Sequence, residues 1–205
     1  MFLRSYGPIL IVGAHPDDSE LMAGGLIYRA VSEGVDVYSV IMSDGCENGE
    51  ATIRKKEVEL ASKILNVKEV FFCGLKDGMI PHNIETVKMI DSFIRDIQPG
   101  IIITHSTEDT HQDHKNVSNI TLSSTRRRQS IVLMGETPTS FFNDNLVYFD
   151  ITDQMKMKIK ALKVYLSQIQ DGPIRLKNIR TLAGYRGQKI GTKYAEAFKS
   201  WRMVL

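Results

Sequence analysis

The sequence has 205 residues and is poor in cysteine, with Cys46 and Cys73 alone. Two cysteines are too few for the disulfide frameworks that stabilise small secreted domains. No apolar run approaches the roughly 20 residues that a transmembrane helix needs. The run from Ile9 to Val12 is also too short for the core of a signal peptide. We therefore expect a cytoplasmic protein without a membrane span.

The chain also has little net charge, +2, but its charges are divided unevenly. Residues 1–150 carry 14 basic and 21 acidic side chains, whereas residues 151–205 carry 12 basic and 3 acidic ones. A basic segment is typical of a solvated helix surface or of an anionic partner. We favour the solvated surface and expect no nucleic-acid partner, because the arginines at 126–128 accompany no nucleic-acid-binding fold motif. An anionic group on a small substrate stays open as the alternative.

The hydrophobic fraction of 42% and the length are typical of one soluble globular domain. Short β-rich runs alternate with helical patterns through the first half of the chain. Strands that alternate with helices predict an α/β fold, doubly wound and Rossmann-like, with a mostly parallel sheet and helices on both faces. The predicted strands are 9–12, 35–42, 70–72 and 101–103, and the predicted helices are 19–33, 52–66 and 84–97.

The alternation of strand and helix patterns becomes less regular in the second half of the chain. We predict one domain over 1–205, with a Rossmann-like core at 1–130 and an extension at 131–205 that completes the site. The clearest late helix is 152–170, whose residues Met155, Ile159, Leu162, Leu166 and Ile169 share one face. In the earlier helix at 52–66, Ile53 and Leu60 are among the apolar positions, and Arg54 and Glu57 are among the polar ones.

Polar residues gather directly after the predicted strands. His15 to Asp18 follow the first strand, Ser43 to Gly45 the second and Gly74 to Gly78 the third. His105 and the segment from His111 to His114 follow the fourth. In an open parallel sheet, ligands bind outside the carboxyl ends of the strands. We therefore expect these four loops to meet and form the functional site.

The first of these loops predicts a cation site. A dinucleotide-binding turn needs glycines, whereas the carboxylates of Asp17 and Asp18 would repel a phosphate. His15 and Asp18 are three residues apart at a strand-to-helix turn, and His114 on the fourth loop is the natural third ligand. Two histidines and one carboxylate form a catalytic zinc set with a position left for water. The same set resembles the facial triad of non-haem iron, so iron stays open.

The neighbours of these ligands are candidate catalytic residues. Asp17 lies beside a ligand, and a free carboxylate next to a metal-bound water is the usual general base. If His114 binds the metal, His111 can face the substrate, and Asp113 can hold His111 in its protonated form.

Other interpretations account for less of the sequence. If Asp17 and Asp18 only cap the following helix, then neither His15 nor the second His-rich loop is explained. The chain could also be a non-catalytic module that binds a sugar or nucleotide and has an inactive metal site. This interpretation conflicts with the presence of the candidate base and all three candidate ligands. For His82 and His105 we favour loop or packing roles.

These motifs resemble the PIG-L/LmbE-like zinc N-deacetylases. The resemblance is carried by Ala-His-Pro-Asp-Asp-Ser-Glu at 14–20 and His-x-Asp-His at 111–114, and it covers nearly the whole chain. Further matches lie at 43–45, 54–57, 61, 65–67, 74–78, 167–168 and 194–198.

The resemblance implies hydrolysis of the acetyl group of an N-acetylglucosamine-type amino sugar, often joined to a larger aglycone, and it suggests a homo-oligomer. It also implies Arg54, together with Asp44, as substrate-binding residues. It implies that His15, Asp18 and His114 are the ligands of one Zn²⁺. It implies that Asp17 is the general base and then the acid. It also implies that His111, assisted by Asp113, stabilises the transition state.

Two positions depart from the family pattern. The family often has a histidine shortly before the Ser-Gln pair at 167–168, where this sequence has Tyr165. The loop 107–112 lacks the aromatic residue that some members have near the site. We expect these differences to affect the choice of substrate and to leave the metal centre intact.

Overall fold

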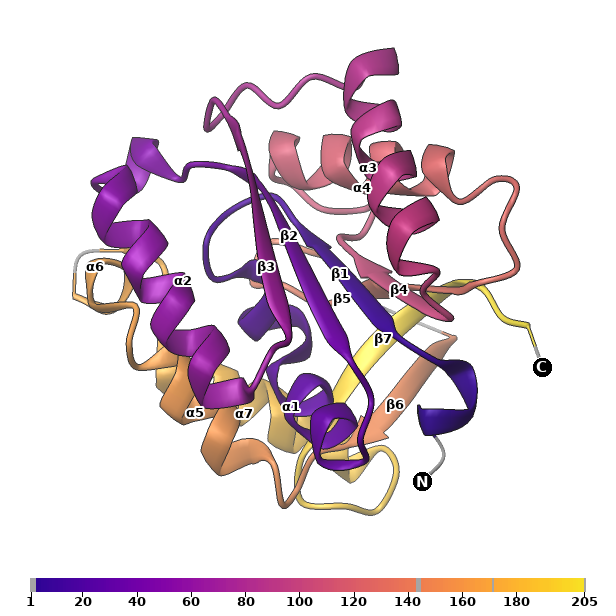
Figure 1. The fold of residues 1–205 in the computed structure, drawn as a ribbon. Coiled ribbons are helices and arrows are strands. Elements are labelled where there is room, and N and C mark those ends of the chain that lie inside the picture. Colours follow the sequence, from indigo (N-terminus) through magenta and orange to yellow (C-terminus); the bar gives the residue numbers. More distant parts are fainter. Residues whose placement is uncertain (1–2, 143–144, 171, 205) are drawn as a thin grey trace.

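The computed structural model describes residues 3–142, 145–170 and 172–204. One sheet runs through the molecule, and the order of its strands is β3-β2-β1-β4-β5-β7-β6 (Figure 1). The first five strands in this order are parallel, and β7 is antiparallel to both of its neighbours. The strands are β1 (Ile9–Gly13), β2 (Val37–Ser43), β3 (Glu69–Leu75), β4 (Ile101–Thr104), β5 (Ile131–Gly135), β6 (Leu146–Asp150) and β7 (Ala195–Arg202).

Helices cover both faces of the sheet, which confirms the predicted single α/β domain with a mostly parallel sheet (Figure 1). One face carries α1 (Asp18–Ser32), α2 (Ala51–Leu65), α5 (Met155–Leu162), α6 (Leu166–Ile169) and α7 (Leu176–Gln188), and the other carries α3 (Ile84–Ile97) and α4 (Gln112–Ser124). Short 3₁₀ helices cover Leu3–Tyr6 and Cys46–Asn48.

The central strand β1 separates two apolar cores. Ile9 and Ile11 belong to the core under α1, α2, α5 and α7, whereas Leu10 and Val12 belong to the core under α3 and α4. Successive side chains of a strand point to opposite faces, so a strand buried on both faces needs an unbroken apolar run. The run 9–12 meets this need and sets β1 in the middle of the sheet.

Helix α1 is kinked at Ala23, where the backbone leaves helical geometry. The kink frees backbone N–H groups, and the carboxylate of Glu196 on β7 accepts those of Gly25 and Leu26 at 2.8 Å each. Lys158 of α5 lies 2.7 Å from the same carboxylate, and both side chains are buried. This ion pair therefore satisfies the broken helical turn and joins α1, α5 and β7.

The predicted helix at 152–170 is wrong in its length, because the structure divides it into α5 and α6. Tyr165 interrupts it with a fully buried side chain, whose hydroxyl donates to Oε2 of Glu20 at 2.9 Å. A continuous helix would place Leu166 on the buried face, but Leu166 is 58% exposed. The buried tyrosine thus turns the chain toward the cavity described below.

Burial in the first half of α2 does not follow the polarity of its residues. Ile53 and Leu60 are 46% and 52% exposed, whereas Arg54 and Glu57 are buried. The carboxylate of Glu57 accepts hydrogen bonds from the backbone N–H and the hydroxyl of Ser167, at 2.9 and 2.7 Å. Arg54 lines the functional cavity and Glu57 holds α6, so the first half of α2 buries polar side chains, whereas Val58, Ala61 and Leu65 further along the helix pack in the apolar core.

All lysines in and directly after α5 except one are exposed, as expected for a solvated helix surface. Lys156, Lys160 and Lys163 are exposed, and Lys158 alone among the lysines of this helix is buried.

None of the helices in residues 3–142, 145–170 and 172–204 has the length and apolar character needed to cross a bilayer.

Candidate active site and metal centre

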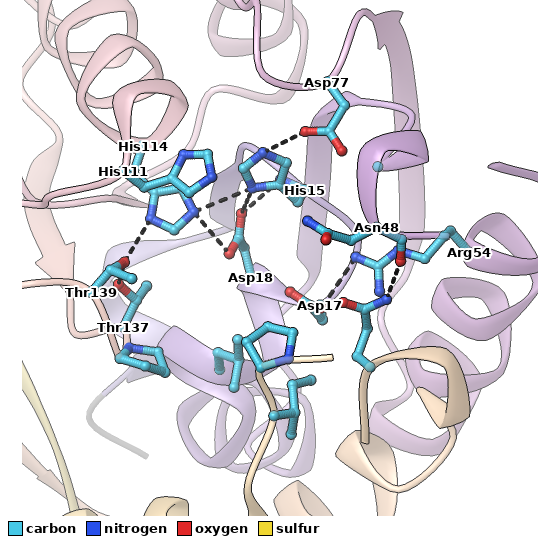
Figure 2. Close-up of a pocket in the computed structure, with 16 residues that line it drawn as sticks. His15, Asp17, Asp18, Asn48, Arg54, Asp77, His111, His114, Thr137 and Thr139 are labelled. Atoms are coloured by element: carbon cyan, nitrogen blue, oxygen red, sulfur yellow. Dashed lines mark hydrogen bonds and ion pairs between the residues drawn. The ribbon is translucent and has the colours of Figure 1, made fainter. Parts of the chain in front are cut away.

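The loops that follow β1, β2, β3 and β4 meet at the carboxyl ends of the strands, as the sequence predicts. They border a cavity of about 300 Å³, whose lining Figure 2 shows. The sequence-predicted residues in this lining are His15, Asp17, Asp18, Arg54, His111 and His114.

Donor atoms of three side chains face one another in this cavity with the spacing of ligands around a zinc ion, with one oxygen of Asp18 near each histidine. Nδ1 of His15 lies 3.2 Å from Nε2 of His114 and 3.5 Å from Oδ2 of Asp18. Nε2 of His114 lies 3.5 Å from Oδ1 of Asp18. Tetrahedral zinc with ligands at about 2.0–2.2 Å separates neighbouring ligand atoms by roughly 3.3–3.5 Å. The three side chains therefore fit a metal ion of this size.

The outward nitrogen of each ligand histidine meets a carboxylate. Nε2 of His15 lies 3.0 Å from Asp77 and 3.3 Å from Asp113, and Nδ1 of His114 lies 3.0 Å from Asp109. Burial alone would lower the pKa of His15, but Asp113, Asp18 and Asp77 raise it to about 12. A carboxylate behind a histidine is the usual support of a metal ligand, because it fixes the ring and its tautomer.

Asp17 lies at the start of α1 in an unusual backbone conformation, with φ 107°. Positive φ is strained for a residue other than glycine and is common at functional sites. Nη2 of Arg54 lies 3.2 Å from Oδ2 of Asp17 and also donates to the carbonyl oxygen of Pro16. Gly45 packs against this turn so closely that a Cβ atom there would lie 2.7 Å from Pro16.

The environment of Asp17 suits a group that exchanges a proton near neutral pH. Burial raises the pKa of its carboxyl to about 7, although the charge of Arg54 lowers it. By contrast, His105 and His114 outweigh the burial of Asp18 and hold the pKa of that carboxyl well below its usual range. The carboxylate of Asp18 is therefore held as an anion, whereas that of Asp17 can exchange a proton near neutral pH.

Arg54 has unused hydrogen-bond donors at the cavity. Its side chain is buried, and its Nε and Nη1 atoms have no partner among the described residues. A buried donor without a partner costs about 1–3 kcal/mol. These two atoms therefore favour a ligand that brings hydrogen-bond acceptors into the cavity.

The expected support of His111 by the carboxylate of Asp113 is not what the structure shows. The Asp113 carboxylate accepts the backbone N–H groups of Gly78 and Ile80 and faces His15. Nδ1 of His111 instead accepts the backbone N–H of Asp113 at 3.2 Å, as the cap of α4. This bond leaves the ring proton on Nε2, and burial together with His114 and His15 lowers the pKa of His111. His111 is thus a neutral donor.

The expected substrate residue Asp44 does not line the cavity. Its carboxylate accepts the backbone N–H of Cys46 at 3.1 Å, and its side chain borders a separate crevice beside Thr52. Asp77, from the corresponding loop after β3, lines the cavity instead and accepts the backbone N–H of Glu47. The Asp-Gly pair occurs in both loops, so the sequence alone does not distinguish which aspartate points inward.

Two residues behind the ligands were not predicted for the site. His105 is fully buried, its Nε2 lies 3.1 Å from Oδ2 of Asp18, and its ring stacks on His114 with centroids 3.9 Å apart. Asp109 contacts His114, as described above. The sequence feature that could have indicated both residues is their position, since both lie between β4 and α4 in the predicted site loop.

His82 is exposed, as a loop residue should be.

The remaining wall of the cavity comes from beyond residue 130. Thr137 and Thr139 follow β5, and Gln168, Pro173 and Ile174 lie in and after α6. The amide of Gln168 donates to the carbonyl oxygen of Asn48 at 2.7 Å, which connects this wall to the loop after β2. The late part of the chain therefore supplies side chains to the same cavity.

The fold and the cavity together define a class of protein. A doubly wound sheet whose strand ends present two histidines and a carboxylate that could hold a metal ion, with a second buried carboxylate beside them, is typical of an enzyme.

The chain belongs to the PIG-L family, described as GlcNAc-PI de-N-acetylase, whose model matches residues 10–125. This membership makes the protein an N-deacetylase, an enzyme that hydrolyses amides, and it confirms the predicted family. Diacetylchitobiose deacetylase of Thermococcus kodakarensis is 27% identical, over 93% of this chain and 82% of its own length.

Solved structures show the same architecture. N,N'-diacetylchitobiose deacetylase of Pyrococcus horikoshii has a TM-score of 0.80 and 26% identity, over 94% of this chain and 83% of its own. GalB of Pseudomonas putida, a 4-carboxy-2-hydroxymuconate hydratase, has a TM-score of 0.83 and 20% identity, over 97% and 98% of the two chains. The second likeness concerns the fold alone.

Proposed function

We propose that this protein is a zinc-dependent hydrolase that removes the N-acetyl group from an N-acetylglucosamine-type amino sugar. The observation that carries the proposal is the spacing of 3.2–3.5 Å between donor atoms of His15, Asp18 and His114, with the free carboxylate of Asp17 next in the chain. When bound, zinc would supply Lewis acidity that polarises an amide carbonyl and lowers the pKa of water toward about 7.

The side chains of the cavity have complementary tasks in this reaction. The carboxylate of Asp17 takes a proton from the attacking water and then gives it to the nitrogen of the leaving amine. His111 donates from Nε2 to the carbonyl oxygen as negative charge develops there, an interaction typically worth about 3 kcal/mol. Nε and Nη1 of Arg54 donate to hydroxyl oxygens of the sugar.

The charges that line the cavity favour a neutral sugar. Among the described lining residues, Arg54 is the sole lysine or arginine, and Asp17 already faces it. The exposed lysines of α5 do not line the cavity. Diacetylchitobiose, after which the similar deacetylases are named, is a substrate of this kind. We therefore expect neutral N-acetylated sugars to react faster than conjugates with a phosphate or carboxylate.

The test is a screen of N-acetylated sugars with amine release as the readout, on protein whose zinc content is known. The panel includes diacetylchitobiose, free N-acetylglucosamine, and nucleotide-, thiol- and lipid-linked forms. We expect turnover of a neutral member by the zinc-loaded enzyme, also under strict anaerobiosis. Activity that needs iron and oxygen would instead support the non-haem iron alternative, and binding of sugars without amine release would support a binding module.

A further inference from the structure

Asp109 connects three parts of the site, although it lies outside the cavity lining. It is 1% exposed and belongs to the loop between β4 and α4. Its Oδ2 lies 3.0 Å from Nδ1 of His114 and accepts the hydroxyl of Thr137 at 2.8 Å. Its Oδ1 accepts the backbone N–H of His111 at 2.8 Å. One carboxylate thus contacts the candidate metal ligand His114, the backbone of the candidate oxyanion donor His111, and Thr137 in the cavity wall after β5.

The contact with His114 determines which nitrogen of that ring is available to an ion. A carboxylate accepts hydrogen bonds and cannot donate them when ionised, so the ring proton must lie on Nδ1. Nε2 then carries its lone pair toward His15 and Asp18. The other neighbour of Nδ1, the Thr139 hydroxyl, lies farther away at 3.4 Å. A hydroxyl can donate as well as accept, so it would not fix the tautomer by itself.

The remaining two contacts hold the carboxylate itself in place. The backbone of His111 is fixed as the first residue before α4, and Thr137 lies in the loop after β5. A buried carboxylate that accepts hydrogen bonds on both oxygens has little freedom to rotate. The ring of His114 is therefore supported from two separate segments of the chain.

We propose that Asp109 is a positioning residue of the metal centre, because it fixes the tautomer and ring orientation of His114. Through its hydrogen bonds it also connects this ligand to His111 and Thr137. The inference rests on the proposed function, because it requires a metal ion at His15, Asp18 and His114. Residues that support metal ligands in this way typically contribute 10–100-fold to metal affinity.

A purely structural role for Asp109 predicts a different outcome. In that case its loss would loosen the loop and lower the unfolding temperature, while folded variants would bind metal as the parent does. Two milder variants separate the roles. Asp109→Asn keeps an acceptor for the Nδ1 proton and removes the charge, and Thr137→Val removes one loop contact and leaves the contact with His114 intact.

The experiment measures zinc affinity of the metal-free full-length chain by competition with a chromophoric chelator, with thermal unfolding as the control for folding. We expect affinity to fall about 10–100-fold in Asp109→Ala, less in Asp109→Asn and least in Thr137→Val, where the carboxylate loses one hydrogen bond and keeps its contact with His114. Cobalt substitution adds a spectroscopic readout, since the visible bands of bound Co²⁺ should shift in Asp109→Ala and Asp109→Asn. Asp153→Asn, at an exposed aspartate, is the matched control.

The results separate failure of this inference from failure of the proposed function. If the parent and His114→Ala bind zinc equally weakly, the metal site itself is absent. If the parent binds zinc through His114 but Asp109→Ala and Asp109→Asn bind it as tightly, with unchanged cobalt spectra, the positioning role of Asp109 is refuted. If Asp109→Ala does not fold, Asp109→Asn decides, and parent-like affinity in that variant overturns the inference.

Discussion

Nη2 of Arg54 lies 3.2 Å from Oδ2 of Asp17, and both side chains are buried at the edge of the cavity. Burial raises the pKa of Asp17, and the guanidinium lowers it. The pair therefore sets the pH at which the carboxyl of Asp17 ionises. Since Arg54 comes from α2 and Asp17 precedes α1, the relationship also ties the two helices together at the site.

Replacement of Arg54 should move the acidic limb of the pH–rate profile. A general base acts when it is ionised, so kcat/KM falls as the pH drops through the pKa of Asp17. In Arg54→Met the compensating charge is lost, and we expect this limb to move upward by about 1–3 pH units. The measurement is kcat/KM against pH in both proteins. Lys56→Met, at an exposed position of α2, should leave the limb in place, and an unmoved limb in Arg54→Met would contradict the pairing.

Removal of a predicted ligand should abolish metal binding, whereas removal of the neighbouring donor should not. We expect His114→Ala to lose zinc, because two ligands remain of three. His111→Ala should retain zinc and lose roughly 10²–10³-fold in kcat, since the donor to the developing oxyanion is missing. Elemental analysis and steady-state rates check this. His82→Ala is the matched control, and normal zinc content in His114→Ala would refute the ligand set.

Glu20 should make stability depend on pH. Burial raises the pKa of this carboxyl from 4.5 to about 8. Between these values the unfolded chain releases a proton that the folded chain retains, so the contribution of Glu20 to stability falls as the pH rises from 4.5 to 8. Glu20→Gln removes this effect and should become more stable relative to the parent across that window, by on the order of 5 kcal/mol.

Urea unfolding of the metal-free proteins at several pH values measures the effect of Glu20. Comparison of the two proteins at each pH cancels the groups they share. A stability difference that stays constant from pH 4.5 to 8 would show that Glu20 ionises normally in the folded state.

The ion pair at the kink of α1 should matter more than its surface neighbours. Lys158→Met leaves the Glu196 carboxylate buried with its two backbone partners and no counterion. Removal of one member of a buried pair costs about 3–5 kcal/mol. Lys160→Met, an exposed change on the same helix, should cost less than about 0.5 kcal/mol. Equal losses in denaturant unfolding would contradict this role.

The parts of the fold that follow from local patterns could be predicted from the sequence. The apolar run 9–12 specifies a strand buried on both faces, and β1 is that strand. The polar residues after the strands specify a site at one edge, because parallel strands bring their carboxyl ends together. The structure accordingly brings His15, Asp18 and His114 together, although their roles stay predictions.

The parts that depend on distant contacts could not be predicted. Glu57 of α2 is buried because it binds Ser167, which lies 110 residues later. The break before α6 depends on the contact of Tyr165 with Glu20, 145 residues earlier. Asp109 could be distinguished from other loop aspartates only once its distance to His114 was known. In each case the deciding partner is remote in sequence.

The central claim is that Asp17 is the base of a metal-dependent amide hydrolysis, and Asp17→Asn tests it most directly. Asparagine tolerates positive φ and has nearly the same shape, so the turn and the zinc site should survive. The measurement is kcat for amine release together with zinc content. We expect one zinc ion per chain and a kcat lower by roughly 10²–10⁴-fold. A variant that keeps zinc and turns over at the parent rate would contradict the account.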